Sequence, residues 1–150
     1  MKIGIIKLGA KGDVLRTMPI LLVIKEKYPN SVITWFTKKE SSEIVSLCSY
    51  VNRIITLPIE LKYQEIIENE FFDILYNFDI ENEATFLIKK LKSEKKRGFS
   101  SELEFPSALN TSAEYYLNMI YDDELKKSNR KTYQQIIFES AELPYKKQHY

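Results

Sequence analysis

The order of apolar segments predicts an α/β protein built on a three-layer, doubly wound parallel sheet. Short runs rich in β-branched and aromatic residues alternate with amphipathic segments of helical spacing. Strands joined by helices form βαβ units, so neighbouring strands should run parallel and helices should cover both faces of the sheet. The expected strands span residues 3–8, 32–37, 53–57, 74–78 and 97–99.

The helices between these strands follow from apolar spacing and stop signals. A helix after the first strand should extend to about Tyr28 and end at Pro29. Pro19 interrupts it, because the residue before a proline avoids the helical region. Either the helix kinks there, or it begins near Thr17 with Pro19 in its first turn. Further helices are expected over residues 40–47, 61–69 and 82–91, the last with Ala84, Leu87, Ile88 and Leu91 on one face.

The chain changes character after Gly98. Residues 100–111 lack periodicity and contain Pro106, so we expect a loop over the carboxyl edge of the sheet. Thr111 or Ser112 can cap the helix that follows. The expected helices span about residues 112–121 and 133–143, on either side of a charged segment at 122–130.

Composition favours a single soluble, cytoplasmic domain. The 150 residues can bury one core. Charge is balanced, with 22 Lys and Arg against 21 Asp and Glu, so nothing points to nucleic acid. The single cysteine, Cys48, excludes an internal disulfide and reads as a small core residue. Met1 leads into a strand without a signal peptide, and no apolar run approaches the ~20 residues of a membrane span.

Other polar and aromatic groups give weaker signals. Tyr115, Tyr116, Tyr121 and Tyr133 could line a sugar or base platform, although helical spacing favours packing. The basic run at 89–97 could face an anion, but a solvated helix face and strand start is favoured. His149, near the end, is not expected to be catalytic, and no cluster has metal-ligand spacing.

The segment at residues 2–13, K-I-G-I-I-K-L-G-A-K-G-D, is the strongest candidate for a functional site. The first strand enters a loop containing Gly9 and Gly12, which delivers Asp13 to the start of a helix. In open α/β sheets the carboxyl end of a strand forms the ligand crevice. Asp13 can be the helix N-cap, a general base, or both, since the helix dipole favours a negative charge there. The spacing matches neither a dinucleotide fingerprint nor a P-loop.

These residues resemble the opening of family 9 glycosyltransferases, the bacterial heptosyltransferases of lipopolysaccharide synthesis. Residues 5–19 carry the motif I-I-K-L-G-A-K-G-D-V-L-R-T-M-P. Further segments match the family pattern in order along the chain. They are Y-P-N-S-V-I-T-W at 28–35, Y-V-N-R-I-I at 50–55, F-D-I-L-Y-N at 72–77, K-R-G-F at 96–99 and N-R-K-T-Y at 129–133.

The resemblance implies the N-terminal, Rossmann-like acceptor-binding half of a two-domain GT-B enzyme, with a βα core over about 1–99 and a loop and helices over 100–150. Asp13 would deprotonate the acceptor hydroxyl. The implied substrate-binding residues are Lys7, Gly9, Gly12, Thr17 and Asp79. The acceptor would be a lipopolysaccharide core or another surface glycan, reached by peripheral contact with the inner membrane. No metal or cofactor is implied.

The resemblance also bears on what lies outside this chain. Family members are about twice as long, so the nucleotide-sugar domain, which would bind ADP-heptose, is expected to be absent here and the 150 residues alone to be inactive. Gly9 and Ala10 stand where the family often has hydroxyl residues, so the sugar and the acceptor stay open.

Two other classes stay open. A stand-alone, non-catalytic α/β binding module would use the same crevice without chemistry. A flavodoxin-like or receiver-like domain has similar alternation, but Asp13 stands alone rather than in an acidic cluster, and no phosphate loop for FMN is present.

Overall fold

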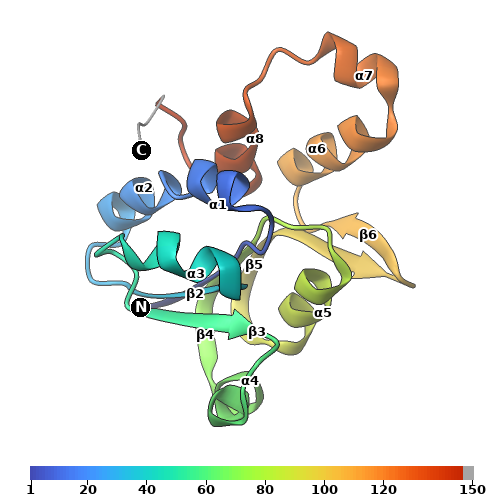
Figure 1. The fold of residues 1–150 in the computed structure, drawn as a ribbon. Coiled ribbons are helices and arrows are strands. Elements are labelled where there is room, and N and C mark those ends of the chain that lie inside the picture. Colours follow the sequence, from blue (N-terminus) through green and yellow to red (C-terminus); the bar gives the residue numbers. More distant parts are fainter. Residues whose placement is uncertain (147–150) are drawn as a thin grey trace.

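The protein, described here for residues 1–146 of a computed structural model, folds around one six-stranded sheet (Figure 1). The strands lie in the order β3-β2-β1-β4-β5-β6. β1 to β5 are parallel, as the sequence predicts, and β1 pairs with β2 on one side and β4 on the other. The strands are β1 Lys2–Ile6, β2 Val32–Lys38, β3 Arg53–Leu57, β4 Phe71–Asn77, β5 Lys92–Glu102 and β6 Phe105–Ala108.

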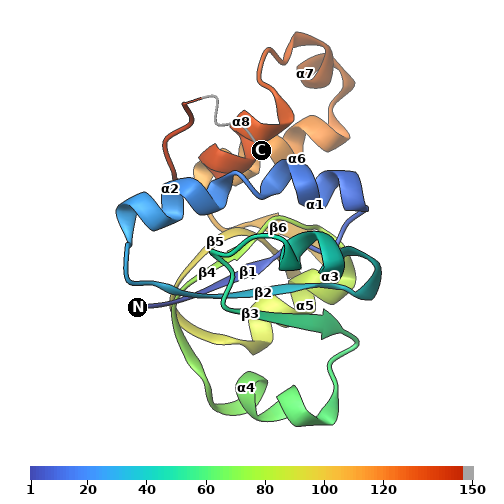
Figure 2. The same cartoon turned by 60° about the vertical axis from the view of Figure 1, so that its left-hand side comes forward.

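Helices cover both faces of this sheet, which gives the three layers expected. Figure 2 shows α1, α2 and α8 on one side, with α4 and α5 on the other. The helices are α1 Lys11–Thr17, α2 Ile20–Lys27, α3 Lys39–Ser46, α4 Gln64–Asn69, α5 Asn82–Lys90, α6 Thr111–Tyr121, α7 Asp123–Ser128 and α8 Tyr133–Ser140, and the 3-10 turn η1 spans Leu61–Tyr63.

Alternation along β1 divides the core into two clusters. Successive side chains of a strand point to opposite faces. Ile3 and Ile5 therefore pack with residues of α1, α2, α3 and α8, whereas Ile6 packs with residues of α4 and α5. The four residues predicted to share a face of α5 and its end are all buried: Ala84, Leu87, Ile88 and Leu91.

The first helix is interrupted at Pro19, which decides between the two sequence alternatives. α1 ends at Thr17 and α2 begins at Ile20, with Met18 and Pro19 at the break. The interruption is the expected effect of proline inside a helical segment. α1 nevertheless begins at Lys11, so Asp13 lies in its first turn and not in a loop before a helix starting near Thr17.

The loop predicted for residues 100–111 is wrong, because β5 and β6 form an antiparallel hairpin there. Glu102 pairs with Phe105 across a two-residue turn in which Leu103 and Glu104 have φ of +49° and +70°. Such turns normally carry Asn or Gly, so no hairpin signal is present at these two residues. Pro106 lies on the edge strand, where proline is tolerated.

The strand expected at 97–99 is also longer than predicted. β5 begins at Lys92, and residues 92–97 include no apolar side chain. β6 pairs only with the last part of β5, so this first half lies at an open edge of the sheet. Charged side chains are usual on such an open edge. The basic run at 89–97 therefore forms the end of α5 and the start of β5, the interpretation that the sequence favoured.

Two helix ends and one additional helix after β6 differ from prediction. Asn110 is the N-cap of α6 in place of Thr111 or Ser112, and its side chain bonds to Gly98 and Ser140. The charged segment contains α7, which Asp122 caps by accepting hydrogen bonds from two backbone amides of that helix. α8 ends at Ser140, earlier than the predicted residue 143.

Candidate active site

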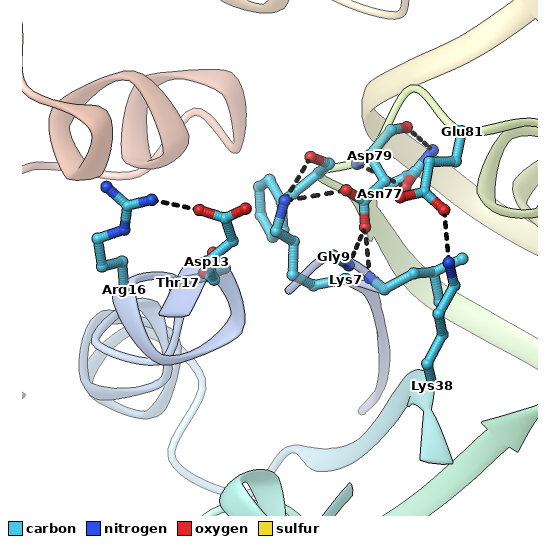
Figure 3. A network of polar contacts seen from close by, with 11 residues as sticks. Lys7, Gly9, Asp13, Arg16, Thr17, Lys38, Asn77, Asp79 and Glu81 are labelled. Carbon is cyan, nitrogen blue, oxygen red and sulfur yellow. Dashed lines mark hydrogen bonds and ion pairs between the residues drawn. The ribbon is translucent and has the colours of Figure 1, made fainter. Parts of the chain in front are cut away.

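The candidate site lies at the carboxyl edge of the sheet, where β1 and β4 end side by side. Ile6 pairs with Asn77 at the last register position of the two strands. The chain then leaves β1 through residues 7–10 into α1, and leaves β4 through residues 78–81 into α5. Figure 3 shows the polar side chains of these two segments facing one another.

A buried ion pair joins the two segments. Lys7 Nζ lies 2.9 Å from Asp79 Oδ1, and the two side chains are only 5% and 9% exposed. Lys7 Nζ also donates to the carbonyl of Phe78 at 3.3 Å. Burial alone would lower the pKa of Lys7, but Asp79 and the Tyr133 phenol outweigh it and raise that pKa above its ordinary value. Lys7 is therefore a charged ammonium held inside the protein.

The second oxygen of Asp79 holds the loop that follows β1. Asp79 Oδ2 accepts a hydrogen bond from the backbone amide of Leu8 and a longer one, 3.4 Å, from that of Gly9. Asn77 fixes Asp79 in turn: the Asp79 amide donates to Asn77 Oδ1, and Asn77 Nδ2 donates to the carbonyls of Asp79 and Phe99, all within 3.0 Å. Asp79 and Asn77 together thus link the loop after β1 to the end of β4 and to β5.

Asp13 faces the other side of the same loop. Ala10 is the N-cap of α1, and no side chain caps this helix. The prediction that Asp13 is the N-cap is therefore wrong: it stands three residues further on, and its carbonyl oxygen accepts from the Thr17 hydroxyl. Its Oδ1 pairs with the Arg16 guanidinium, and its side chain is 37% exposed. Asp13 is an accessible carboxylate.

Gly9 lies between the two carboxylates. A Cβ built at Gly9 would be 3.5 Å from Asp13 Oδ2 and 3.7 Å from Asp79 Oδ1. Gly12 is exposed, and a Cβ there would meet no atom within 4 Å. Only Gly9 lies in the loop, because α1 begins at Lys11 and places Gly12 in its first turn, contrary to the predicted loop position of Gly12. Neither glycine carries a side chain that would cover Asp13.

Two tyrosines line the site and two do not. The Tyr133 ring centroid is 4.5 Å from Arg16 Cζ and 5.8 Å from Lys7 Nζ. Burial, followed by the nearby Tyr133, Asp13 and Asp79, raises the pKa of Tyr116, although Lys7 opposes this. Tyr115 instead donates to Asn129, and Tyr121 is exposed. The four tyrosines therefore form no common platform.

The site residues predicted from the resemblance divide into exposed and buried groups. Asp13 and Gly12 are accessible, and Gly9 is half-buried. Lys7, Thr17 and Asp79 are buried, with their polar atoms engaged within the protein. Their substrate-binding roles stay predictions.

Sequence reasoning missed Arg16 and Asn77. Arg16 had a usable signal, since it lies three residues after Asp13 on one helix face. Asn77 had none, because its bonds reach from β4 to the loop after it and to β5. Lys38 and Glu81 form a more exposed ion pair, at 3.0 Å, on the rim of the same edge.

Over residues 1–146, no group of three His, Cys, Asp or Glu side chains is arranged to hold a metal ion. In the same range, no helix is long and apolar enough to cross a membrane. Cys48 packs at the border of the core. His149 lies outside the described residues.

Comparison with known proteins gives one sequence relative among curated proteins and several structural ones. The lipopolysaccharide core heptosyltransferase OpsX of Haemophilus influenzae is 27% identical over 106 residues, 65% of this chain and 30% of the relative. The glycosyl transferase family 9 structure from Veillonella parvula superposes with a TM-score of 0.60 at 21% identity, covering 69% of this chain and 32% of the other. The resemblance to family 9 glycosyltransferases is thereby confirmed.

Other neighbours have the same fold. The E. coli heptosyltransferase WaaC, solved with ADP, gives a TM-score of 0.58 at 21% identity, with 65% of this chain and 35% of WaaC covered. The chain thus spans about a third of the length of the relatives it matches. No protein-family model matches the chain.

Proposed function

We propose that this chain is the acceptor-binding domain of a glycosyltransferase, which transfers heptose or a related sugar from a nucleotide-sugar to a lipopolysaccharide or other surface-glycan acceptor. The observation that carries the proposal is the position of Asp13. It is an accessible carboxylate on the first turn of α1, at the carboxyl edge of a parallel sheet. Ligands of open α/β sheets bind at this edge. The likeness to heptosyltransferases supports the same assignment.

The geometry suits Asp13 as a general base. Arg16 donates to Oδ1, whereas Oδ2 faces Gly9 and accepts no hydrogen bond within the described part of the chain. An acceptor hydroxyl within about 3 Å of Oδ2 would give up its proton to Asp13 as its oxygen attacks the anomeric carbon. The bond to the nucleotide diphosphate breaks in the same step, and the leaving group takes the electron pair.

The nucleotide-sugar would be bound outside this chain. The structural neighbours include WaaC with ADP and with ADP-2-deoxy-2-fluoro heptose, and this chain covers 35% and 36% of those two chains. We therefore assign ADP-heptose, or a similar donor, to a second domain, and we expect transfer to need no metal. The proposal implies that the enzyme acts in the cytoplasm, in peripheral contact with the membrane that holds the acceptor.

Titration of the isotope-labelled chain tests this assignment. A lipopolysaccharide-core oligosaccharide should shift the backbone NMR signals of Gly9, Gly12 and Asp13 in a saturable way. ADP-heptose should give no saturable shift below roughly millimolar, a binding free energy near −4 kcal/mol. Micromolar binding of ADP-heptose would mean that this domain binds the donor and that the proposal has the halves reversed.

A non-catalytic binding module would give a different result. It would bind the oligosaccharide, but addition of a donor-binding half would produce no transfer that depends on Asp13. The acceptor titration and a transfer assay together therefore separate a transferase domain from a binding module.

A further inference from the structure

The structure assigns to Asp79, with Lys7, the role of a positioning residue that fixes the loop before α1 and so places Asp13, in contrast to the acceptor-binding role implied by the family resemblance. This inference rests on the proposed function, in which Asp13 is the base. The observation behind it is the set of contacts that joins the end of β4 to residues 7–9.

The Asp79 carboxylate is already occupied by hydrogen-bond donors of the protein itself. Its side chain is 9% exposed, and its two oxygens already receive the Lys7 ammonium and the amides of Leu8 and Gly9. A carboxylate that accepts this many donors in a buried position has little capacity left for a sugar hydroxyl. Lys7 is equally buried, so it is also badly placed to meet a ligand.

The path along the chain from the Asp79 contacts to the base is short. The amides that Asp79 holds lie immediately before Ala10, the N-cap of α1. Gly9 is in reach of both carboxylates, so a change in its position also changes the surroundings of Asp13 Oδ2. Loss of the Asp79 contacts would free this loop, and with it the first turn of α1.

Asp79 is itself anchored on the sheet. The Asn77 side chain accepts a hydrogen bond from the Asp79 amide and donates to the Asp79 carbonyl. It also donates to the carbonyl of Phe99 on β5. Next to that carbonyl, a Cβ at Gly98 would lie 1.9 Å from the Asn77 carbonyl oxygen, so the two backbones fit only because Gly98 has no side chain. The position of Asp13 therefore depends on contacts with β4 and β5, in addition to its own helix.

NMR of the 150-residue chain tests the positioning directly. Asp79→Asn keeps the side-chain shape, but its amide oxygen is a weaker acceptor than a carboxylate and carries no charge, so the ion pair with Lys7 is lost. Exchange of the Leu8 and Gly9 amide hydrogens should then become about tenfold faster. The nuclear Overhauser contact between Gly9 Hα and Asp13 Hβ should weaken. Unchanged exchange together with an unchanged contact would overturn the inference.

Two further variants make this test robust. Asp73→Asn changes another acid of β4, which bonds to the Lys2 amide at 2.7 Å on the opposite edge, and it should leave Leu8, Gly9 and Asp13 unaffected. If Asp79→Asn does not fold, Lys7→Met/Asp79→Asn removes the unpaired ammonium as well. That double variant should fold and still show the faster exchange, and normal exchange in it would contradict the inference.

Kinetics of an intact transferase that contains this chain distinguish positioning from ligand binding. Displacement of the base should lower kcat of Asp79→Asn by about 10²-fold and leave KM for the acceptor nearly unchanged. A raised KM with normal kcat would instead make Asp79 an acceptor ligand. If the wild-type protein shows no transfer, the proposed function fails, while the amide exchange experiment still decides whether Asp79 holds the loop.

Discussion

Two aspartate–cation pairs at the same edge of the sheet have opposite surroundings. Asp79 and Lys7 are 72 residues apart in sequence and have side chains 9% and 5% exposed. Asp13 and Arg16 are three residues apart on one short helix and have side chains 37% and 47% exposed. The first pair is shared with backbone groups of two segments, whereas the second is a contact along the surface of α1.

This difference in burial indicates which acid keeps the site in shape and which acid is available for chemistry. A buried pair resists separation, because each charge left alone in the interior is strongly destabilising. An exposed pair separates at little cost, because water solvates both partners. A base needs a carboxylate oxygen that a substrate hydroxyl can reach. Of the two acids, Asp13 meets this requirement and Asp79 does not.

The largest expected effect comes from breaking the buried pair. Lys7→Met leaves the Asp79 carboxylate buried without its cation, so the free energy of unfolding should fall by about 3–5 kcal/mol. Lys38→Met is the matched control, since its pair with Glu81 is 31% and 44% exposed, and it should cost no more than ~1 kcal/mol. Urea unfolding of both variants measures the difference. Equal losses would mean that burial does not distinguish these pairs.

A double substitution sharpens the same contrast. Lys7→Met/Asp79→Asn removes both charges, so no uncompensated ion stays buried. It should be more stable than the sum of the single losses implies, with a coupling of about 1–3 kcal/mol from the double-mutant cycle. Additive losses would show that the two side chains stabilise the fold independently.

Alkaline pH provides a smaller, directional effect. The folded-state pKa of Lys7 lies above the ordinary lysine value of 10.5. The pair's contribution to stability is therefore complete below pH 10.5 and is lost as the pH rises from there toward the folded-state pKa. Relative to the Lys7→Met/Asp79→Asn variant, the wild-type protein should lose stability more steeply in that window. Parallel melting curves for the two proteins above pH 10.5 would contradict this.

The smallest effect belongs to the exposed pair. Arg16→Gln removes the partner of Asp13 and the cation over the Tyr133 ring, yet the Arg16 and Asp13 side chains are both partly exposed to water. The free energy of unfolding should change by less than about 1 kcal/mol, and by less still in high salt. Thermal unfolding at two salt concentrations checks this. A loss comparable with that of Lys7→Met would make the Asp13–Arg16 pair structural after all.

The sheet and the place of Asp13 could be predicted because they depend on local patterns and general topology. The alternation of apolar runs fixes parallel strands, and parallel strands bring the loop after residue 8 to the carboxyl edge. The β5–β6 hairpin could not be predicted, since Leu103 and Glu104 are unusual residues for a turn with positive φ. The role of Asp13 as a cap failed because Ala10, with no capping side chain, begins the helix.

The buried contact between Lys7 and Asp79 could not be predicted, for a different reason. Lys7 and Asp79 were both predicted as site residues from the resemblance, but their contact joins segments that only the order of β1 and β4 brings together. A sequence pattern gives no pairing between single polar residues so far apart. Burial, which decides what each acid can do, appears only in the folded structure.

The most direct test of the account is turnover and unfolding measured on one preparation of Asp13→Asn, in an intact transferase that contains this chain. The amide keeps the size of the side chain but cannot take the proton. Turnover should fall by about 10²–10⁴, while the free energy of unfolding changes by less than ~1 kcal/mol, as for other exposed groups. Near-normal turnover, or a loss of turnover that only follows a loss of stability, would contradict the assignment of Asp13 as the base.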